Sequence, residues 1–150
     1  MTKKAMVLET LKRSGKMLAQ AVQEKAENMT GTELNAEATY IPDFAKAVAK
    51  MNMLERPIGF VCKSTAGRVV KLIQPYDSTV YTAEPEELPA QWGFVWSKDP
   101  KHALPFVALS TSPYNKDECC TDDGIVYRST IDNNTWKPSD YSQGWEAVTE

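Results

Sequence analysis

A chain of 150 residues with 42% hydrophobic and 25% charged residues has the composition of an ordinary soluble protein of one or two small domains. Its net charge of −3 is uneven, because residues 1–28 hold six Lys or Arg against three Glu and the remainder is acidic. The acidic remainder argues against a nucleic-acid groove. We expect no membrane span, since no apolar run reaches 18 residues, and no signal peptide, since no apolar segment follows Lys3 and Lys4.

Residues 4–28 are predicted to form a helix, because apolar residues recur at alternating spacings of three and four. The apolar stripe is narrow, and two interpretations of it stay open. It can be a coiled-coil seam between subunits, or the face by which the helix packs on the rest of its own chain. A homo-oligomer through this helix would use four stripe residues: Leu8, Leu11, Leu18 and Val22.

A break and a second helix are expected next. Residues 28–38 are polar around Thr30-Gly31-Thr32 and are interpreted as a break. Pro42 can open a helix over residues 43–53 because proline is tolerated in the first turn, and Arg56-Pro57 would end it. The residues expected to face inward from this helix are Phe44, Val48 and Met51.

From Ile58 onward the predicted segments are short, because turn residues and prolines recur. Strands are expected at 58–63, 68–74, 92–96, 104–109, 125–131 and 145–148. The acidic run 117–123, with adjacent Cys119 and Cys120, is interpreted as a hairpin tip closed by Asp122-Asp123-Gly124. It lacks a nearby histidine and C-x-x-C spacing, so no metal site is predicted, and adjacent cysteines rarely form a disulfide. Cys62 is expected to be a small core residue.

Two stretches of the β region share one order of landmarks, which predicts an internal duplication of residues 67–95 and 124–148. In each copy a glycine leads into a strand, a proline lies seven residues before a tryptophan, and a valine lies three residues after it. The second copy has a hairpin loop four residues shorter than the first. The matched landmarks are Gly67 and Gly124, Pro85 and Pro138, Trp92 and Trp145, and Val95 and Val148.

Together these elements predict an α+β fold with an N-terminal helical arm followed by two small tandem all-β modules. The expected divisions are the arm at 1–35, a short helix and connector at 36–56, and modules at 57–96 and 97–150. Modules of this size rarely fold alone, so we expect them to pack on each other or on the helices.

The second copy resembles the small carbohydrate-binding-like modules of families five and twelve, especially the variants in tail proteins of bacteriophages and phage-derived contractile particles. Three segments hold the likeness: Gly124–Ser129, Asp132–Pro138 and Gly144–Val148. Residues 67–95 match more weakly, with Val70 in place of Tyr127 and no counterpart of Trp136. Residues 1–56 lie outside the likeness.

The resemblance implies a structural virion component of a tail tip, baseplate or fibre attachment, made in the host cytoplasm, whose β modules contact other tail proteins. The alternative is recognition of bacterial surface polysaccharide by aromatic rings that stack on pyranose faces. The candidate carbohydrate-binding residues are Trp136, Tyr141 and Tyr127. Trp136 can equally plug the small core, and that is the role we expect for it.

We expect no enzymatic activity, cofactor or metal. The one histidine, His102, lies in a loop between two prolines and is expected to be exposed. The carboxylates Glu84, Glu86 and Glu87 lie in a proline-rich connecting loop and are interpreted as a solvated face rather than a glycosidase pair.

Overall fold

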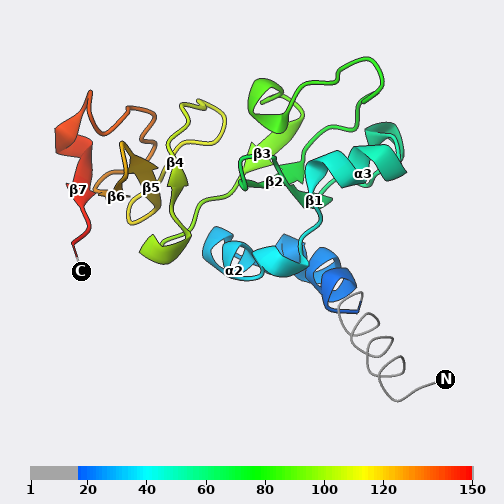
Figure 1. Cartoon of the computed structure of the whole chain (residues 1–150), viewed down its shortest axis with the longest axis horizontal. Coiled ribbons are helices and arrows are strands. Elements are labelled where there is room, and N and C mark those ends of the chain that lie inside the picture. The colour runs from blue at the N-terminus through cyan, green and yellow to red at the C-terminus, as the bar shows by residue number, and fades with distance from the viewer. Residues whose placement is uncertain (1–16, 150) are drawn as a thin grey trace.

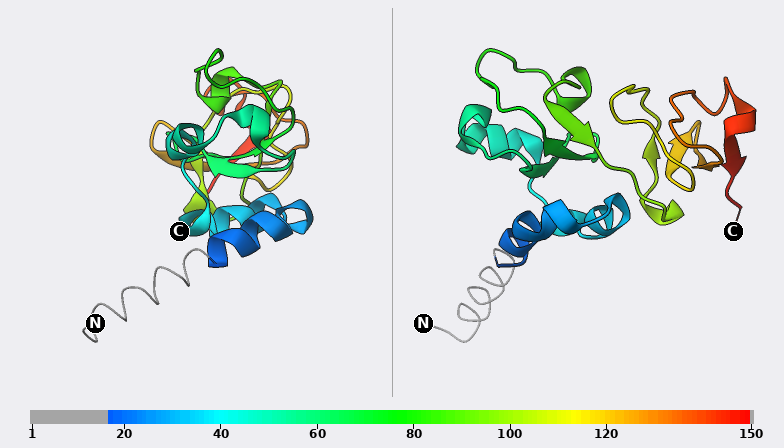
Figure 2. Two further views of the ribbon diagram at one scale, coloured as in Figure 1. Left: turned by 90° about the vertical axis from the view of Figure 1, so that its right-hand side faces the viewer. Right: turned by 180° about the vertical axis from the view of Figure 1, so that it is seen from behind.

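The computed structural model describes residues 17–149, and their fold is α+β. A helical segment at the N-terminal end of this range is followed by a three-stranded sheet and then a four-stranded sheet (Figure 1). This order confirms the coarse prediction of helix first and two β regions after it. The two sheets lie side by side along the long axis, and the first helices run beneath the first sheet (Figures 1 and 2). Within residues 17–149 we find no helix with the length and apolar character needed to cross a membrane.

The expected break over residues 28–38 is wrong for most of its length. Residues 17–25 are helical and pass into a 3₁₀ turn at Ala26–Asn28, after which α2 covers Gly31–Ala36. A capping box starts α2: Glu33 N donates to Thr30 Oγ1 at 3.1 Å, and Thr30 N donates to Glu33 Oε1 at 3.0 Å. These hydrogen bonds lower the pKa of Glu33. The Thr-x-x-Glu pattern is the sequence signal for this helix, and the polar composition of the segment concealed it.

The second predicted helix is real but shorter than expected, because α3 covers Phe44–Lys50 and Met51 is already extended. A 3₁₀ turn at Met53–Glu55 follows it. Phe44 is buried and Val48 packs against the core, as predicted. Met51 is 39% exposed, so its expected inward orientation is wrong, and Met53 fills the core instead.

The first sheet has the order β1-β2-β3 and is antiparallel throughout, with β1 at Val61–Lys63, β2 at Val69–Leu72 and β3 at Trp92–Phe94. The second sheet has the order β4-β5-β6-β7, and only β4 and β5 are parallel. Its strands are β4 at Leu104–Pro105, β5 at Cys119–Asp122, β6 at Ile125–Ser129 and β7 at Trp145–Ala147.

Strand β5 corrects the interpretation of the acidic run as a hairpin tip. Only its end forms the turn, where Asp123 and Gly124 adopt positive φ angles of 53° and 79°. Two such residues in succession are what a two-residue hairpin turn of type I′ requires. Cys119 and Cys120 lie earlier, inside the strand, and both are buried. Consecutive strand residues point to opposite faces, so the two thiols are directed away from each other.

The last two strands of each sheet pair in the same register. In both sheets the tryptophan lies opposite the residue five positions after the leading glycine, and both glycines have positive φ. The next amide along the chain donates to the carbonyl before the tryptophan in each sheet. The matched pairs are Leu72 with Trp92 and Ser129 with Trp145, and the matched bonds are Ile73 N to Gln91 O at 2.7 Å and Thr130 N to Gly144 O at 2.9 Å. The matched glycines and tryptophans therefore occupy equivalent positions in the two sheets, as the predicted duplication requires.

The duplication extends upstream of the segment that the sequence indicated. A cysteine lies opposite the third residue after each glycine, Cys62 opposite Val70 and Cys120 opposite Tyr127. A short parallel pairing then adds to the outer edge of each cysteine strand, at Asp43 in the first sheet and at Leu104–Pro105 in the second. We therefore call residues 42–96 the first unit and residues 104–148 the second unit.

Each unit also seats a phenylalanine edge-on against its tryptophan. Phe44 lies 5.8 Å from Trp92 between ring centroids with the planes at 80°, and Phe106 lies 6.1 Å from Trp145 at 89°. The two phenylalanines follow the matched parallel pairings. The sequence does not reveal that the two phenylalanines are equivalent, because Phe44 lies in a helix and Phe106 follows a strand.

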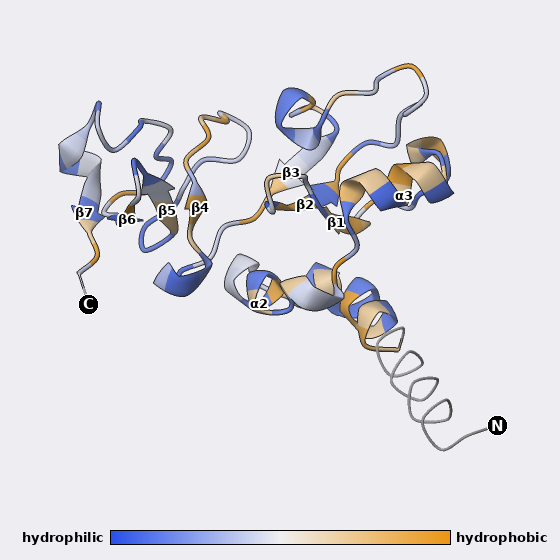
Figure 3. Ribbon diagram, in the orientation of Figure 1, coloured by the Kyte–Doolittle hydropathy of each residue, from blue (hydrophilic) through white to orange (hydrophobic). Residues whose placement is uncertain are grey.

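One hydrophobic core joins the two units. Trp96 stacks on Phe94 at 5.8 Å and on Tyr114 at 4.3 Å, and Tyr114 meets Trp145 edge-on at 5.3 Å. The expectation that the small modules pack on each other is therefore confirmed. Hydrophobic residues (orange in Figure 3) recur in α3 and the first sheet, whereas the loops around β6 and β7 are mostly hydrophilic.

A second cluster holds the N-terminal helix against the first unit. Its buried members are Val22, Ala26, Leu34, Ile41, Val61 and Val69. Val22 is therefore packed inside its own chain rather than in a seam between subunits, which favours the intrachain interpretation of the stripe at this position. Leu18 is 45% exposed, and Leu8 and Leu11 lie outside the described residues.

Candidate aromatic binding site

Two aromatic side chains meet on the surface of the loop between β6 and β7. Trp136 is 51% exposed and Tyr141 is 36% exposed. Their ring centroids are 5.3 Å apart, and their planes are tilted by 39°. The expectation that Trp136 plugs the core is therefore wrong. The structure places two of the predicted carbohydrate-binding residues, Trp136 and Tyr141, side by side in solvent.

A fully buried asparagine shapes the loop that presents the pair. The Asn134 side chain accepts from Trp136 N at 3.2 Å and donates to Gly144 O at 2.9 Å and to Ser129 Oγ at 3.1 Å. Its backbone exchanges two hydrogen bonds with Tyr114, at 2.9 and 2.7 Å. Because one residue ties both ends of the loop to the core, Trp136 and Tyr141 sit on a firmly held backbone.

The two rings are held by different neighbours. The Tyr141 ring lies directly over Gly144, where an added Cβ would come within 2.7 Å of its Cδ1 atom. Only glycine leaves room for this approach. Beneath Trp136, the buried Trp145 donates from Nε1 to the Trp136 carbonyl oxygen at 2.7 Å. The core tryptophan predicted at position 145 thus supports the surface tryptophan directly.

Polar groups border the pair. Lys137 Nζ lies 3.7 Å from Asp122 Oδ1, and Ser139 N donates to Asp122 Oδ2 at 3.1 Å. Asp122 is largely buried, so it anchors the turn between the two rings, whereas Lys137, Ser139 and Asp140 are exposed. Aromatic faces bordered by hydrogen-bonding groups suit a ligand with apolar faces and polar edges, as pyranose sugars have.

Tyr127, the third predicted sugar-binding residue, does not join the pair. It lies on β6 opposite Cys120 and Ala147, is half-buried, and packs against the hydrophobic core. The candidate site therefore reduces to Trp136 and Tyr141.

All three cysteines are buried. Burial raises the pKa of the Cys62 and Cys120 thiols to about 12 in each case, and it also raises the pKa of Cys119. A raised pKa disfavours the thiolate, which is the form in which a cysteine acts as a nucleophile or a metal ligand. The expected role of Cys62 as a core residue is confirmed.

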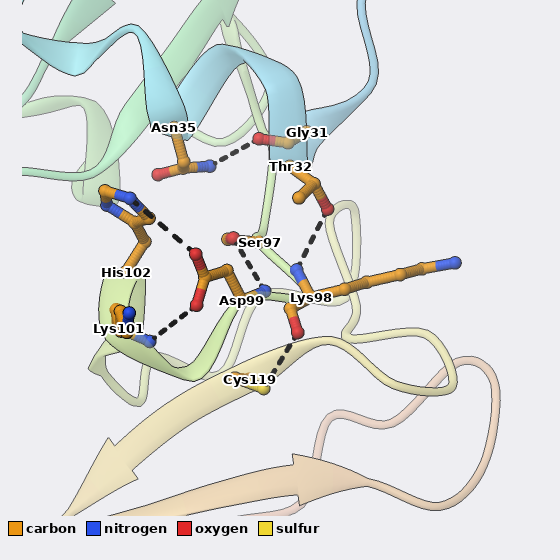
Figure 4. Close-up of polar contacts among 9 residues, drawn as sticks. All are labelled: Gly31, Thr32, Asn35, Ser97, Lys98, Asp99, Lys101, His102 and Cys119. Carbon is orange, nitrogen blue, oxygen red and sulfur yellow. Dashed lines mark hydrogen bonds and ion pairs between the residues drawn. The ribbon is translucent and has the colours of Figure 1, made fainter.

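A separate polar cluster joins α2 to the segment between the sheets (Figure 4). Lys98 N donates to Thr32 Oγ1 at 3.0 Å, and Cys119 Sγ donates to Lys98 O at 3.8 Å. His102 Nε2 lies 4.0 Å from Asp99 Oδ2, and His102 is exposed, as predicted. The side chains of Thr32 and Cys119 both bond to the backbone of Lys98, so this residue links α2 to strand β5 of the second sheet. Among residues 17–149, His, Cys, Asp and Glu form no group of three or more that could hold a metal ion.

Comparisons of the chain with known protein families, with curated proteins and with solved structures found no match.

Proposed function

We propose that the second unit binds a glycan through Trp136 and Tyr141. The observation that supports this proposal is the exposure of two neighbouring aromatic rings on a loop tied to the core by Asn134. Burial of large aromatic side chains is favourable, and exposure of two of them contributes nothing to folding. An exposed pair on a firmly held backbone therefore favours a ligand-binding role. The sequence resemblance implies bacterial surface polysaccharide as the class of ligand.

The angle between the rings constrains the ligand. Because the planes differ by 39°, one flat sugar chain cannot lie parallel to both rings. We propose that two sugar rings turned relative to each other stack on Trp136 and Tyr141, one on each. Lys137 and Asp140 are exposed in the turn between the two rings and would supply polar contacts to the edges of those sugars.

The first unit differs from the second at the same positions. Counting from the matched prolines, Ala83 stands where Trp136 does and Leu88 stands where Tyr141 does. The first unit is instead packed by the N-terminal helix and α3. This difference favours a second proposal, that the first unit and its helices serve as the structural part of a phage or phage-like tail component. Recovery of the protein from purified tail particles by mass spectrometry tests that assignment.

Alanine substitution of the two rings tests glycan binding. Trp136→Ala and Tyr141→Ala should each weaken retention on bacterial cell-wall polysaccharide about fivefold or more, since one stacking contact contributes about 1 kcal/mol. The fold should survive, because both side chains are exposed. Affinity electrophoresis and pull-down on cell-wall preparations measure retention.

Tyr81→Ala is the matched control, because Tyr81 is an exposed aromatic residue, 57% exposed, in the first unit. It should retain full binding. Equal retention by the wild-type protein and the Trp136→Ala/Tyr141→Ala double variant would overturn the proposal, as would a wild-type protein that no wall glycan retains.

A further inference from the structure

An open groove of about 1330 Å³ runs along the first unit, between the helical residues 17–25 on one side and α3 with β1 on the other. Its floor is apolar and its rim is polar. The buried lining residues are apolar and form this floor: Ile41, Ala47 and Phe60. A smaller hollow of about 380 Å³ shares Asp43, Lys46 and Lys63 with the groove and continues it past β1.

The groove is basic although the chain is acidic. Its charged lining residues are four cations and one carboxylate: Lys46, Lys50, Arg56 and Lys63 against Asp43. Asp43 already lies between two of these cations, 3.9 Å from Lys46 Nζ and 3.8 Å from Lys63 Nζ. Lys46 keeps 84% of its side chain exposed, so the positive rim faces solvent.

The walls of the groove are firmly held. The Gln23 side chain donates to Val61 O at 2.7 Å and accepts from Val61 N at 3.0 Å, which ties the helix to the edge of β1. Arg56 lies over the Phe60 ring at 4.4 Å and donates to Ala47 O at 3.0 Å. A partner therefore meets a surface that is formed before binding, which lowers the entropy cost of association.

The charges of the segments of this chain indicate which of them fits the basic groove. Residues 1–16 contain five Lys or Arg against one Glu, so they would be repelled by the rim. The second unit has the opposite character, with seven carboxylates against three cations in residues 104–148. Its β5–β6 hairpin ends in Asp123-Gly124-Ile125, where Asp123 is exposed and Ile125 is 47% exposed. Asp122 is already paired with Lys137, so the tip presents the exposed Asp123 carboxylate and the Ile125 side chain. One exposed carboxylate beside an apolar side chain matches a basic rim with an apolar floor.

We propose that the groove of one molecule receives the β5–β6 hairpin tip of a second copy. The two surfaces are different, so the contact is heterologous and joins molecules head to tail. Lys46, Lys50 and Asp123 are exposed, and the association should therefore be weak and should fade with salt. The Debye length falls from about 10 Å at 0.1 M to about 3 Å at 1 M.

Two variants that each remove one half of the contact test the proposal. Lys46→Glu/Lys50→Glu alters the groove and leaves the tip, and Asp123→Asn/Ile125→Ser alters the tip and leaves the groove. Asparagine tolerates the positive φ at position 123, and Lys46, Lys50 and Ile125 are exposed, so both proteins should fold. Sedimentation velocity at low and high salt measures their assembly.

The wild-type chain should associate as its concentration rises at low salt, and each variant alone should associate about tenfold more weakly or not at all. A mixture of the two variants should form a 1:1 complex and nothing larger, because only one intact groove and one intact tip remain in it. Lys101→Glu/Lys116→Glu, which changes the charge equally at exposed lysines outside the groove, should associate like the wild type.

Several results would overturn the proposal: a wild-type chain that stays monomeric, a groove variant that associates as the wild type does, or a mixture that forms larger species. Association through the N-terminal stripe would survive the groove substitutions and be lost in Leu18→Asp. Glycan retention by Lys46→Glu/Lys50→Glu should match the wild type, so the outcome for the groove is independent of the outcome for the aromatic pair.

Discussion

At the scale of single residues, buried side chains hold the loops that carry exposed ones. The two matched tryptophans are each buried and each donate a hydrogen bond into the loop of their own unit. Trp92 donates to Tyr76 Oη at 3.1 Å, and Trp145 donates to the Trp136 carbonyl at 2.7 Å. In the second unit this bond links the core directly to the backbone of the surface ring.

Trp145→Ala should therefore unfold the second unit or leave it marginal. Loss of a buried tryptophan costs about 3–5 kcal/mol, a large part of the stability of a small domain. Urea denaturation followed by circular dichroism gives the change. Trp136→Ala is the internal control, since an exposed ring should cost far less. Equal stability of the two variants would show that Trp145 is not a core residue.

At the scale of elements, the short helix α2 helps to fix the segment that joins the two sheets. Helix α2 begins at a capping box and lies against the segment between the two sheets. A Cβ on Gly31 would collide with the Trp96 carbonyl, and Asn35 donates to Val95 O at 3.3 Å. The helix thus packs where the first unit ends, and its geometry depends on the cap that orients its first turn.

Thr30→Ala should lower the free energy of unfolding by about 1 kcal/mol, the usual cost of losing an N-cap hydrogen bond. Thr30→Ser keeps the hydroxyl that accepts from Glu33 N and should restore most of the loss. Thermal and urea unfolding of the three proteins provide the comparison. If serine and alanine behave alike at this position, the capping bond contributes nothing to stability.

At the scale of the whole molecule, the two units share one core and should unfold together. Trp96 lies in the segment that links them, donates from Nε1 to Ser112 O at 2.9 Å, and stacks on Tyr114. Arg68 of the first unit forms a largely buried pair with Glu86 at 3.2 Å, so the interpretation of Glu86 as part of a solvated face is wrong. Arg68 also donates to Pro105 O of the second unit at 2.6 Å. Because of these contacts, we expect neither unit to unfold independently of the other.

We expect a single cooperative transition in which tryptophan fluorescence and far-ultraviolet circular dichroism coincide. Trp96→Ala should shift both signals together, by about 3–5 kcal/mol, because it opens the shared core. Two resolved transitions in the wild-type chain would mean that the units are independent domains.

Part of this architecture could be predicted from local patterns. The matched glycines, prolines and tryptophans revealed the duplication because each residue type has a positional requirement, such as positive φ at Gly67 and Gly124. Strand β5 was missed because its buried face consists of Cys119 and Cys120 within an acidic run, a pattern typical of a turn. Helix α2 was missed because its capping box lies in a polar segment.

The sequence by itself determined the order of helix and β regions, the repeated landmarks and the hairpin turn at Asp123-Gly124, since these depend on neighbours along the chain. Only the tertiary structure decided that Trp136 is exposed, that Val22 is buried and that a basic groove exists beside α3. The physical reason is that exposure depends on what distant residues cover. Trp145 and Tyr114 fill the core that Trp136 was expected to fill, and Val61 and Val69 cover Val22.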